Sequence, residues 1–177
     1  MKIRKCLSFD DVLLVPKMSE IVSRKEIDLS SSLSSNMKFS LPIISSPMDT
    51  VTESRMALSM SSRGGLGVIH RYNTIDEQVK MSREAQGEGG ITAAAIGVSG
   101  DYIERASALY DAGVRILCID IAHGHHSLMK KSLASLRGVF GDNVHIMAGN
   151  VATRKGYESL ADWGASSVRV GIGGGSI

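Results

Sequence analysis

The sequence predicts an α/β fold of the (β/α)8 TIM-barrel type, and three observations lead to that expectation. Short apolar runs rich in β-branched residues alternate with amphipathic stretches that end at glycine. The apolar runs begin near residues 43, 66, 91, 115, 144 and 167, so each interval of 23 to 29 residues holds one strand and one helix. Polar residues gather where these strands end, which is where barrel enzymes keep their chemistry.

Residues 1–40 differ from the rest of the chain, and we expect them to form an N-terminal segment that covers the barrel or a neighbouring subunit. A short apolar stretch ends at Pro16, and six of the twelve residues from 29 to 40 are serine. This composition suits a covering segment better than a core strand. We interpret the serine run as a solvated loop.

From residue 41 to residue 177 the repetition of strands and helices predicts a partial barrel built on a parallel sheet. Two helices can be recognised directly, and Gly113 and Gly164 follow them as C-terminal stops. Their apolar faces are formed by Ile103, Ala106, Leu109 and Tyr110 in the first helix and by Tyr157, Leu160, Ala161 and Trp163 in the second.

A doubly wound sheet is the main alternative, and the turn after the first strand argues against it. A dinucleotide-binding sheet opens with a glycine-rich turn, whereas residues 45–50 (SSPMDT) contain no glycine.

Eight strand–helix units of roughly 25 residues, starting near residue 43, would run to about residue 240. We therefore expect about the first six strands here, which form an incomplete barrel. The polar strand ends are Ser46, His70, Asp120, Asn150 and the glycines from residue 171 onward.

Composition argues against several classes of protein. The chain has 177 residues, of which 43% are hydrophobic and 21% charged, and its net charge is +2. This apolar content is too high for disorder, and the balanced charge leaves no electrostatic footprint for nucleic acid. No apolar run near the start is long enough for a signal peptide or a membrane span. Because two cysteines make no disulfide framework, we expect a soluble, cytoplasmic protein.

Residues 171–177 (GIGGGSI) follow the sixth strand as a glycine-rich loop. Successive backbone amides there can form an anion-binding nest, with the Ser176 hydroxyl as a further donor. Carbonyl groups of the same loop can instead coordinate a monovalent cation, and a flexible turn is the plain alternative. We favour phosphate binding, because the loop lies at the chemical end of a barrel strand.

Asp120 is the strongest candidate outside that loop. Ile116, Cys118 and Asp120 share one face of the fourth strand, and the residues between them share the other. A carboxylate on the inward face is costly without a partner. Ribose hydroxyls would be natural partners, and a structural hydrogen bond to a neighbouring loop is the alternative. Cys118 is expected to fill space rather than to act as a nucleophile.

The histidines fall into two groups. His123, His125 and His126 lie close together, but no carboxylate or cysteine stands at metal-ligand spacing from them. Contact with a substrate or cofactor is therefore favoured over metal binding. His70 and His145 have no comparable neighbours and are expected to be packing residues.

Three further residues at strand ends could contact a ligand. The Asn150 amide can both donate and accept hydrogen bonds, which suits a purine or a ribose. Ser46 and Met48 could supply a hydroxyl and a soft apolar contact. Both residues could equally be ordinary lining of the barrel.

Six segments together resemble the IMP dehydrogenase and GMP reductase family. Since a glycine loop alone would be weak evidence, the resemblance depends on the number and the order of the matching segments. They run through the chain in the family's order, at 7–16 (LSFDDVLLVP), 47–53 (PMDTVTE), 64–70 (GGLGVIH), 119–125 (IDIAHGH), 148–153 (AGNVAT) and 170–177 (VGIGGGSI).

The resemblance implies a (β/α)8 barrel assembled as a homo-tetramer. In this family the dehydrogenase oxidises C2 of IMP with NAD to give XMP, a step of GMP biosynthesis. The reductase converts GMP to IMP with NADPH. Both enzymes use a cysteine thiolate that attacks the purine C2. The expected partners are IMP or GMP, with NAD or alternatively NADPH as cofactor and a potassium ion.

Carried over by position, the resemblance assigns roles to individual residues. Asp120 matches the carboxylate near the nicotinamide ribose of the cofactor. Gly173 and Gly175 match the carbonyl donors to the potassium ion. The positions that match substrate contacts are Ser46, Met48, Asn150, Gly175 and Ser176.

The family's catalytic cysteine would directly follow Ile177, and neither Cys6 nor Cys118 replaces it by position. No catalytic residue is therefore assigned, and residues 1–177 by themselves are expected to be inactive. The alternative from another functional class is that the chain is a non-catalytic fragment, or one half of a split protein that needs a C-terminal partner to supply the rest of the barrel.

The resemblance favours the dehydrogenase over the reductase by a small margin. Segments 47–53 and 64–70 look more like a dehydrogenase, whereas Ile121 and Ala122 look more like a reductase. Residues 71–91 pass straight to the third strand, so no inserted regulatory module is expected.

Overall fold

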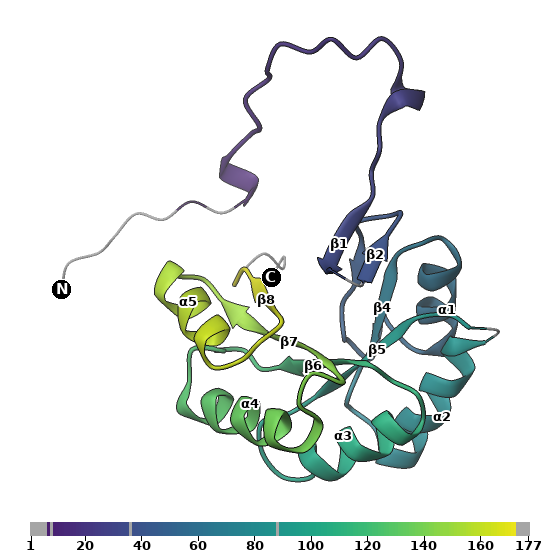
Figure 1. Cartoon of the computed structure of the whole chain (residues 1–177), viewed down its shortest axis with the longest axis vertical. Helices are drawn as coiled ribbons and strands as arrows, with labels where there is room; N and C mark the ends of the chain where they lie inside the picture. The colour runs from purple at the N-terminus through teal and green to yellow at the C-terminus, as the bar shows by residue number, and fades with distance from the viewer. Residues whose placement is uncertain (1–6, 8, 36, 88, 173–177) are drawn as a thin grey trace.

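A computed structural model describes residues 7, 9–35, 37–87 and 89–172 of the chain (Figure 1). Within these residues an extended N-terminal arm leads into a small hairpin and then into alternating strands and helices. The 3-10 helices are η1 (Phe9–Asp11) and η2 (Arg24–Glu26). The strands are β1 (Ser31–Ser34), β2 (Met37–Phe39), β3 (Ile44–Ser45), β4 (Leu66–Ile69), β5 (Thr92–Ile96), β6 (Ile116–Asp120), β7 (His145–Val151) and β8 (Ser167–Val170). The α-helices are α1 (Ser54–Ser62), α2 (Ile75–Gln86), α3 (Tyr102–Asp111), α4 (Ser127–Phe140) and α5 (Arg154–Asp162).

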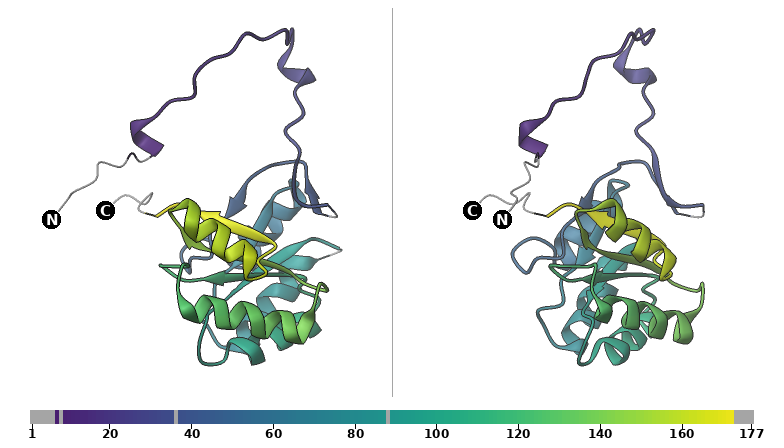
Figure 2. Two further views of the ribbon diagram at one scale, coloured as in Figure 1. Left: turned by 60° about the vertical axis from the view of Figure 1, so that its left-hand side comes forward. Right: turned by 90° about the vertical axis from the view of Figure 1, so that its left-hand side faces the viewer.

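Strands β3 to β8 form one parallel sheet in the order β3-β4-β5-β6-β7-β8, so each strand pairs with its neighbours in sequence. All six begin within one residue of the predicted positions. Helices α1 to α5 lie along the outer side of the sheet (Figures 1 and 2). This half-barrel confirms the predicted incomplete (β/α) barrel.

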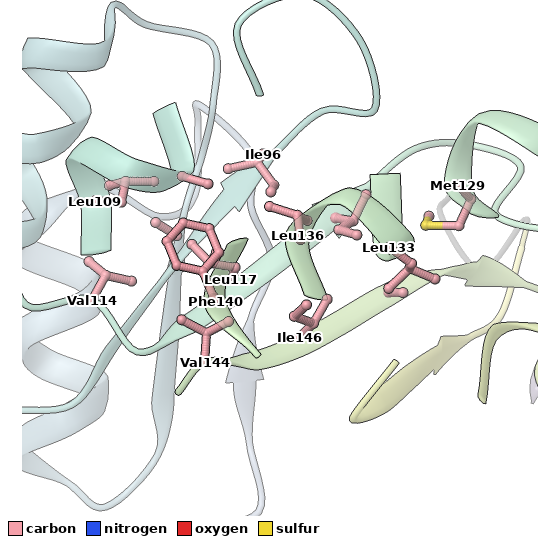
Figure 3. Close-up of a cluster of buried hydrophobic side chains, with 14 of the residues drawn as sticks. Ile96, Leu109, Val114, Leu117, Met129, Leu133, Leu136, Phe140, Val144 and Ile146 are labelled. Atoms are coloured by element: carbon pink, nitrogen blue, oxygen red, sulfur yellow. The ribbon is translucent and has the colours of Figure 1, made fainter. Parts of the chain in front are cut away.

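The sheet is apolar on both faces, as a parallel sheet covered on both sides requires. Along β6, Leu117 and Ile119 belong to the large cluster under the helices, which Figure 3 shows, whereas Ile116 and Cys118 belong to the inner cluster. The alternation predicted for this strand is confirmed. No helix within the described residues is both long and apolar enough to cross a membrane.

The serine-rich run does not form the solvated loop that its composition suggests. Strands β1 and β2 pair antiparallel as a hairpin. Phe39 is buried in the inner cluster, and Leu33 and Met37 pack against the same cluster. The apolar residues interspersed among the serines give the hairpin one face that covers the inner side of the sheet, which composition alone did not indicate.

The arm before the hairpin is mostly exposed. It extends away from the sheet, turns back near η2 and reaches the sheet again at the β1–β2 hairpin (Figure 2). Leu13 and Leu14 expose 96% and 97% of their surface, and Met18 and Val22 are similarly open. The described residues of the arm therefore add little to the core. Whether the arm covers a neighbouring subunit stays a prediction.

The helix faces follow the sequence in one case and depart from it in the other. In α3, Ala106 and Leu109 are buried as predicted, with Ile103 and Tyr110 packed against the same cluster. In α5 the buried positions are Gly156 and Leu160, whereas Tyr157 and Ala161 are exposed. The predicted α5 face is wrong at these two positions, because the helix turns the Gly156 side towards the sheet.

Both glycine stops are confirmed. Gly113 and Gly164 follow α3 and α5 with φ of 92° and 101°, a conformation that favours glycine. The starts of α2 and α5 carry side-chain caps. Thr74 and Glu77 form a capping box at α2, and the Thr153 side chain accepts the Gly156 N–H at α5.

A buried polar network ties the ends of β4 and β5 to two helices. The Gln78 side chain on α2 is fully buried, and its Nε2 donates to the carbonyl oxygens of His70 (2.9 Å) and Ala95 (2.8 Å). Its Oε1 accepts from Arg105 Nη1 on α3 at 2.9 Å. Arg105 is 7% exposed and forms an ion pair with Asp101 at 2.7 Å. The buried side-chain groups of Gln78 and Arg105 are thereby satisfied.

We predict that Gln78→Leu lowers the free energy of unfolding by about 2–4 kcal/mol, because two carbonyls and a guanidinium lose their buried partner. Urea unfolding followed by circular dichroism measures the change. The control is Lys80→Leu on the exposed side of the same helix, which we expect to shift stability by no more than about 0.5 kcal/mol. Equal stability of Gln78→Leu and the wild type would contradict the prediction.

Candidate functional site

The carboxyl ends of parallel strands meet at one edge of a sheet, and this edge holds a cavity of about 360 Å³. Ser46, Met48 and Asp120, three of the predicted site residues, line this cavity, and their role in binding stays a prediction. A larger hollow of about 580 Å³ lies at the opposite edge, where β4 and β5 begin, and it contains none of the predicted site residues. The cavity at the carboxyl edge is lined by Ser46, Pro47, Met48, Asp49, Tyr72, Asp120 and Arg169.

Asp120 and Arg169 form an ion pair inside this cavity. The two side chains are 21% and 25% exposed, so the pair is partly shielded and still open to a ligand. Although burial acts in the opposite direction, the neighbouring Cys118 thiol and Asp120 carboxylate raise the pKa of Arg169. The arginine therefore stays charged. It is the partner that stabilises the Asp120 carboxylate on the inward face of the strand.

Strand register brings the two charges together. Asp120 on β6 is opposite Gly149 on β7, and Gly149 is opposite Arg169 on β8. A Cβ atom at position 149 would lie 2.6 Å from the Arg169 Cβ and 2.8 Å from its carbonyl oxygen. The missing side chain of Gly149 therefore lets Arg169 reach across β7 to Asp120.

Cys118 lies beneath the ion pair and is fully buried. Burial raises the pKa of its thiol to about 11, although Arg169, whose Nη1 is 3.5 Å from the sulfur, acts in the opposite direction. A thiol protonated at neutral pH is a poor nucleophile. The environment therefore suits the space-filling role expected for Cys118.

The turn after β3 presents the two predicted substrate contacts. Ser46 is exposed and Met48 is 51% exposed, and both line the cavity. The buried Thr52 fixes the turn, because its Oγ1 donates to the Ser46 carbonyl at 2.6 Å and its N–H donates to the Met48 carbonyl at 2.9 Å. Backbone contacts hold the turn and leave both side chains available.

Asn150 lies beside the cavity rather than in its lining. Its side-chain Nδ2 donates to the Gly171 backbone carbonyl at 2.9 Å. The backbone carbonyl of Asn150 accepts the Gly124 N–H at 2.7 Å. The Gly149–Asn150 peptide bond is cis. Asn150 thus joins the end of β7 to the first residue of the glycine-rich loop, and direct contact with a nucleotide stays a prediction.

Residues 173–177 of the glycine-rich loop lie outside the described residues. Gly173, Gly175 and Ser176, predicted to bind phosphate and, for the two glycines, potassium, belong to this part of the chain. Cys6 also lies outside the described residues. The roles expected for all of them stay predictions.

The histidines of the loop before α4 do not converge on one point. His126 caps the helix, because its Nδ1 accepts the Leu128 N–H at 3.0 Å, and the His125 ring packs against Trp163 at 5.8 Å. His123 is exposed. Across the part of the chain that the structure describes, no three His, Cys, Asp or Glu residues are grouped as a metal site would require.

His70 and His145 are both buried, as expected for packing residues. His145 Nε2 lies 2.8 Å from Ser167 Oγ, and burial, with the nearby Arg137 guanidinium, lowers the pKa of this histidine. His70 lies at the end of β4 and accepts the Tyr72 N–H on Nδ1 at 3.2 Å.

Four lining residues were not predicted from the sequence: Pro47 and Asp49, which flank the predicted Met48, and the more distant Tyr72 and Arg169. Arg169 is the basic residue within the apolar strand 167–170, and its place on the inward face could have indicated a partner for Asp120. Tyr72 follows β4 as a surface residue, and no local pattern in the sequence distinguishes it. Its place in the cavity depends on how the strand ends converge.

Comparison with known proteins shows one family. The family model described as "IMP dehydrogenase / GMP reductase domain" matches residues 6–177. The inosine-5'-monophosphate dehydrogenase of Nitrosopumilus maritimus is 29% identical over all of this chain and 63% of its own length. That of Cryptosporidium parvum is 33% identical over 99% of this chain and 53% of its own length. The enzyme of the same name from Borreliella burgdorferi is 30% identical over 98% of this chain and 55% of its own length. The chain therefore spans between about half and two thirds of these relatives.

We predict that Cys118 stays unmodified by iodoacetamide at pH 8 in the folded protein, because its thiol ionises only near pH 11 and is buried. A Cys6→Ser variant leaves Cys118 as the single cysteine, so intact mass reports on it alone. Unfolding in urea should allow complete modification. Rapid modification of the folded variant at pH 8 would contradict the burial described above.

We also predict that Gly149→Ala destabilises the protein by about 1–3 kcal/mol, because the added methyl group overlaps the Arg169 backbone. The control is Gly138→Ala in α4, where a Cβ meets nothing within 4 Å, and it should raise stability by up to about 1 kcal/mol. Urea unfolding measures both variants. A Gly149→Ala protein as stable as Gly138→Ala would overturn the close approach.

Proposed function

The chain belongs to the IMP dehydrogenase / GMP reductase family, and from that membership we propose that its protein is a purine nucleotide oxidoreductase that oxidises IMP to XMP with NAD. The observation that carries the proposal is the cavity at the carboxyl edge of the sheet. It brings together a hydroxyl, a thioether and a paired carboxylate, on the residues to which the family resemblance assigns nucleotide contacts.

The lining of the cavity fits a nucleotide. Asp120 is partly exposed, and an ionised carboxylate has several acceptor positions. Arg169 occupies part of them and leaves the others to accept hydrogen bonds from two ribose hydroxyls. We assign Asp120 to the ribose of the cofactor, with Arg169 holding the carboxylate ionised and oriented.

Ser46 and Met48 are assigned to the substrate. The Ser46 hydroxyl can donate to or accept from a polar group of the nucleotide, and the Met48 thioether offers a polarisable surface to its base. Thr52 keeps both residues at the mouth of the cavity through the backbone contacts described above. Asn150 contributes by holding Gly171 at the start of the loop assigned to phosphate.

NAD, when bound, would accept a hydride from C2 of the purine. The chain's own groups bind and orient the two nucleotides, so that their reacting ends lie together in one cavity. Cys118 takes no part as a nucleophile, because it is buried and its pKa is raised to about 11. The family resemblance alone supports a homo-tetramer and a potassium ion at Gly173 and Gly175.

The second candidate is GMP reductase activity with NADPH. Ile121 and Ala122, which directly follow Asp120, look more like the reductase than the dehydrogenase. The relatives described above are named inosine-5'-monophosphate dehydrogenase, which favours the first candidate.

The experiment assays the protein purified from its native source with IMP and NAD, and separately with GMP and NADPH. We expect NADH to form in the first assay. Oxidation of NADPH in the second assay alone would establish the reductase instead. Turnover in neither assay would overturn the proposed function.

We predict that Asp120→Asn raises KM for NAD about 10- to 100-fold, because the ribose loses a charged acceptor worth roughly 1.5–3 kcal/mol. The KM for IMP should change much less. Steady-state kinetics with each nucleotide varied in turn separates the two effects. The control is Asp162→Asn on the exposed end of α5, which should leave both constants unchanged. A larger effect on IMP than on NAD would contradict the assignment of Asp120 to the cofactor.

A further inference from the structure

Tyr72 is an aromatic side chain in the cavity lining that the proposed function does not use. It lies in the loop between β4 and α2 and is 62% exposed. Within the described part of the chain its hydroxyl has no hydrogen-bond partner. A large exposed aromatic surface beside a partly buried ion pair is unusual for a packing residue.

Tyr72 is nevertheless held in place by its neighbours. Its N–H donates to His70 Nδ1 at 3.2 Å, and the two rings stack with centroids 6.3 Å apart and an interplanar angle of 23°. The Arg71 guanidinium carbon lies 5.2 Å from the centroid of the Tyr72 ring. These contacts orient the ring before any ligand binds, which reduces the entropy lost on binding.

The anchoring extends into the core of the protein. His70 is 3% exposed, and its carbonyl accepts hydrogen bonds from Gln78 at 2.9 Å and from Asn73 at 3.3 Å. The loop that carries Tyr72 is therefore fastened at the end of β4 by buried groups. The ring is exposed, but it is presented by a rigid support.

We propose that Tyr72 is a binding residue that stacks against the planar base of a nucleotide in the cavity. The inference rests on the proposed function and deepens it. Ser46, Asp120 and Arg169 line the same cavity, so a base against Tyr72 would leave its ribose near polar groups. The base is either the purine of the substrate or a ring of the dinucleotide cofactor, and both offer the same flat π surface.

Calorimetric titration of the full chain with IMP and, separately, with NAD tests the proposal. Tyr72→Phe keeps the aromatic ring and should bind both nucleotides within about twofold of the wild type. Tyr72→Ala and Tyr72→Leu should weaken binding of one nucleotide roughly tenfold or more, because base stacking on aromatic side chains is worth that much. Leucine is the matched control for apolar contact without a π surface.

Each outcome decides the question. A loss confined to IMP assigns the ring to the purine, and a loss confined to NAD assigns it to the cofactor. The control Tyr157→Ala on α5 changes another exposed tyrosine and should leave both affinities unchanged. Wild-type binding with unchanged affinities in Tyr72→Ala and Tyr72→Leu would overturn the stacking role alone. A wild-type chain that binds neither nucleotide would overturn the stacking role, and absence of turnover in the native protein would overturn the proposed function itself.

Discussion

A parallel sheet has to be covered on both faces, and this requirement organises the whole molecule. Helices α1 to α5 cover the outer face, where the largest apolar cluster lies, and the β1–β2 hairpin packs on the inner face. With both faces covered, the edge where the strands end is the place where polar groups can gather at low cost. The candidate site occupies this edge because the rest of the sheet is committed to burial.

Strand register lowers the free-energy cost of placing a charged side chain at that edge. Asp120, Gly149 and Arg169 stand side by side on three neighbouring strands, and the glycine provides the space that the arginine needs. The resulting ion pair is partly open, so it keeps Asp120 ionised without sealing it from a ligand. In this row of the sheet, the glycine gives the space, the arginine balances the charge, and the aspartate is the group that we assign to ligand binding.

Support for the other side of the cavity comes from buried polar groups. Gln78 and Arg105 fasten the ends of β4 and β5 to α2 and α3. The loop that carries Tyr72 begins at the end of β4, so its position depends on this network as much as on its own sequence. Removing one member would leave buried groups without partners. The same groups therefore serve stability and the geometry of the site.

The amino-acid sequence by itself determined the strand–helix rhythm, the start of each strand to within one residue, and the inward face of β6, because periodicity and glycine stops are local properties. It also placed Ser46, Met48 and Asp120 at strand ends. The pairing of Asp120 with Arg169, the entry of Tyr72 into the cavity and the hairpin of the serine-rich run depend on contacts between distant segments. Likewise, the side of α5 that faces the sheet was decided by packing. Local patterns carry no information about such contacts, so only the tertiary structure decided them.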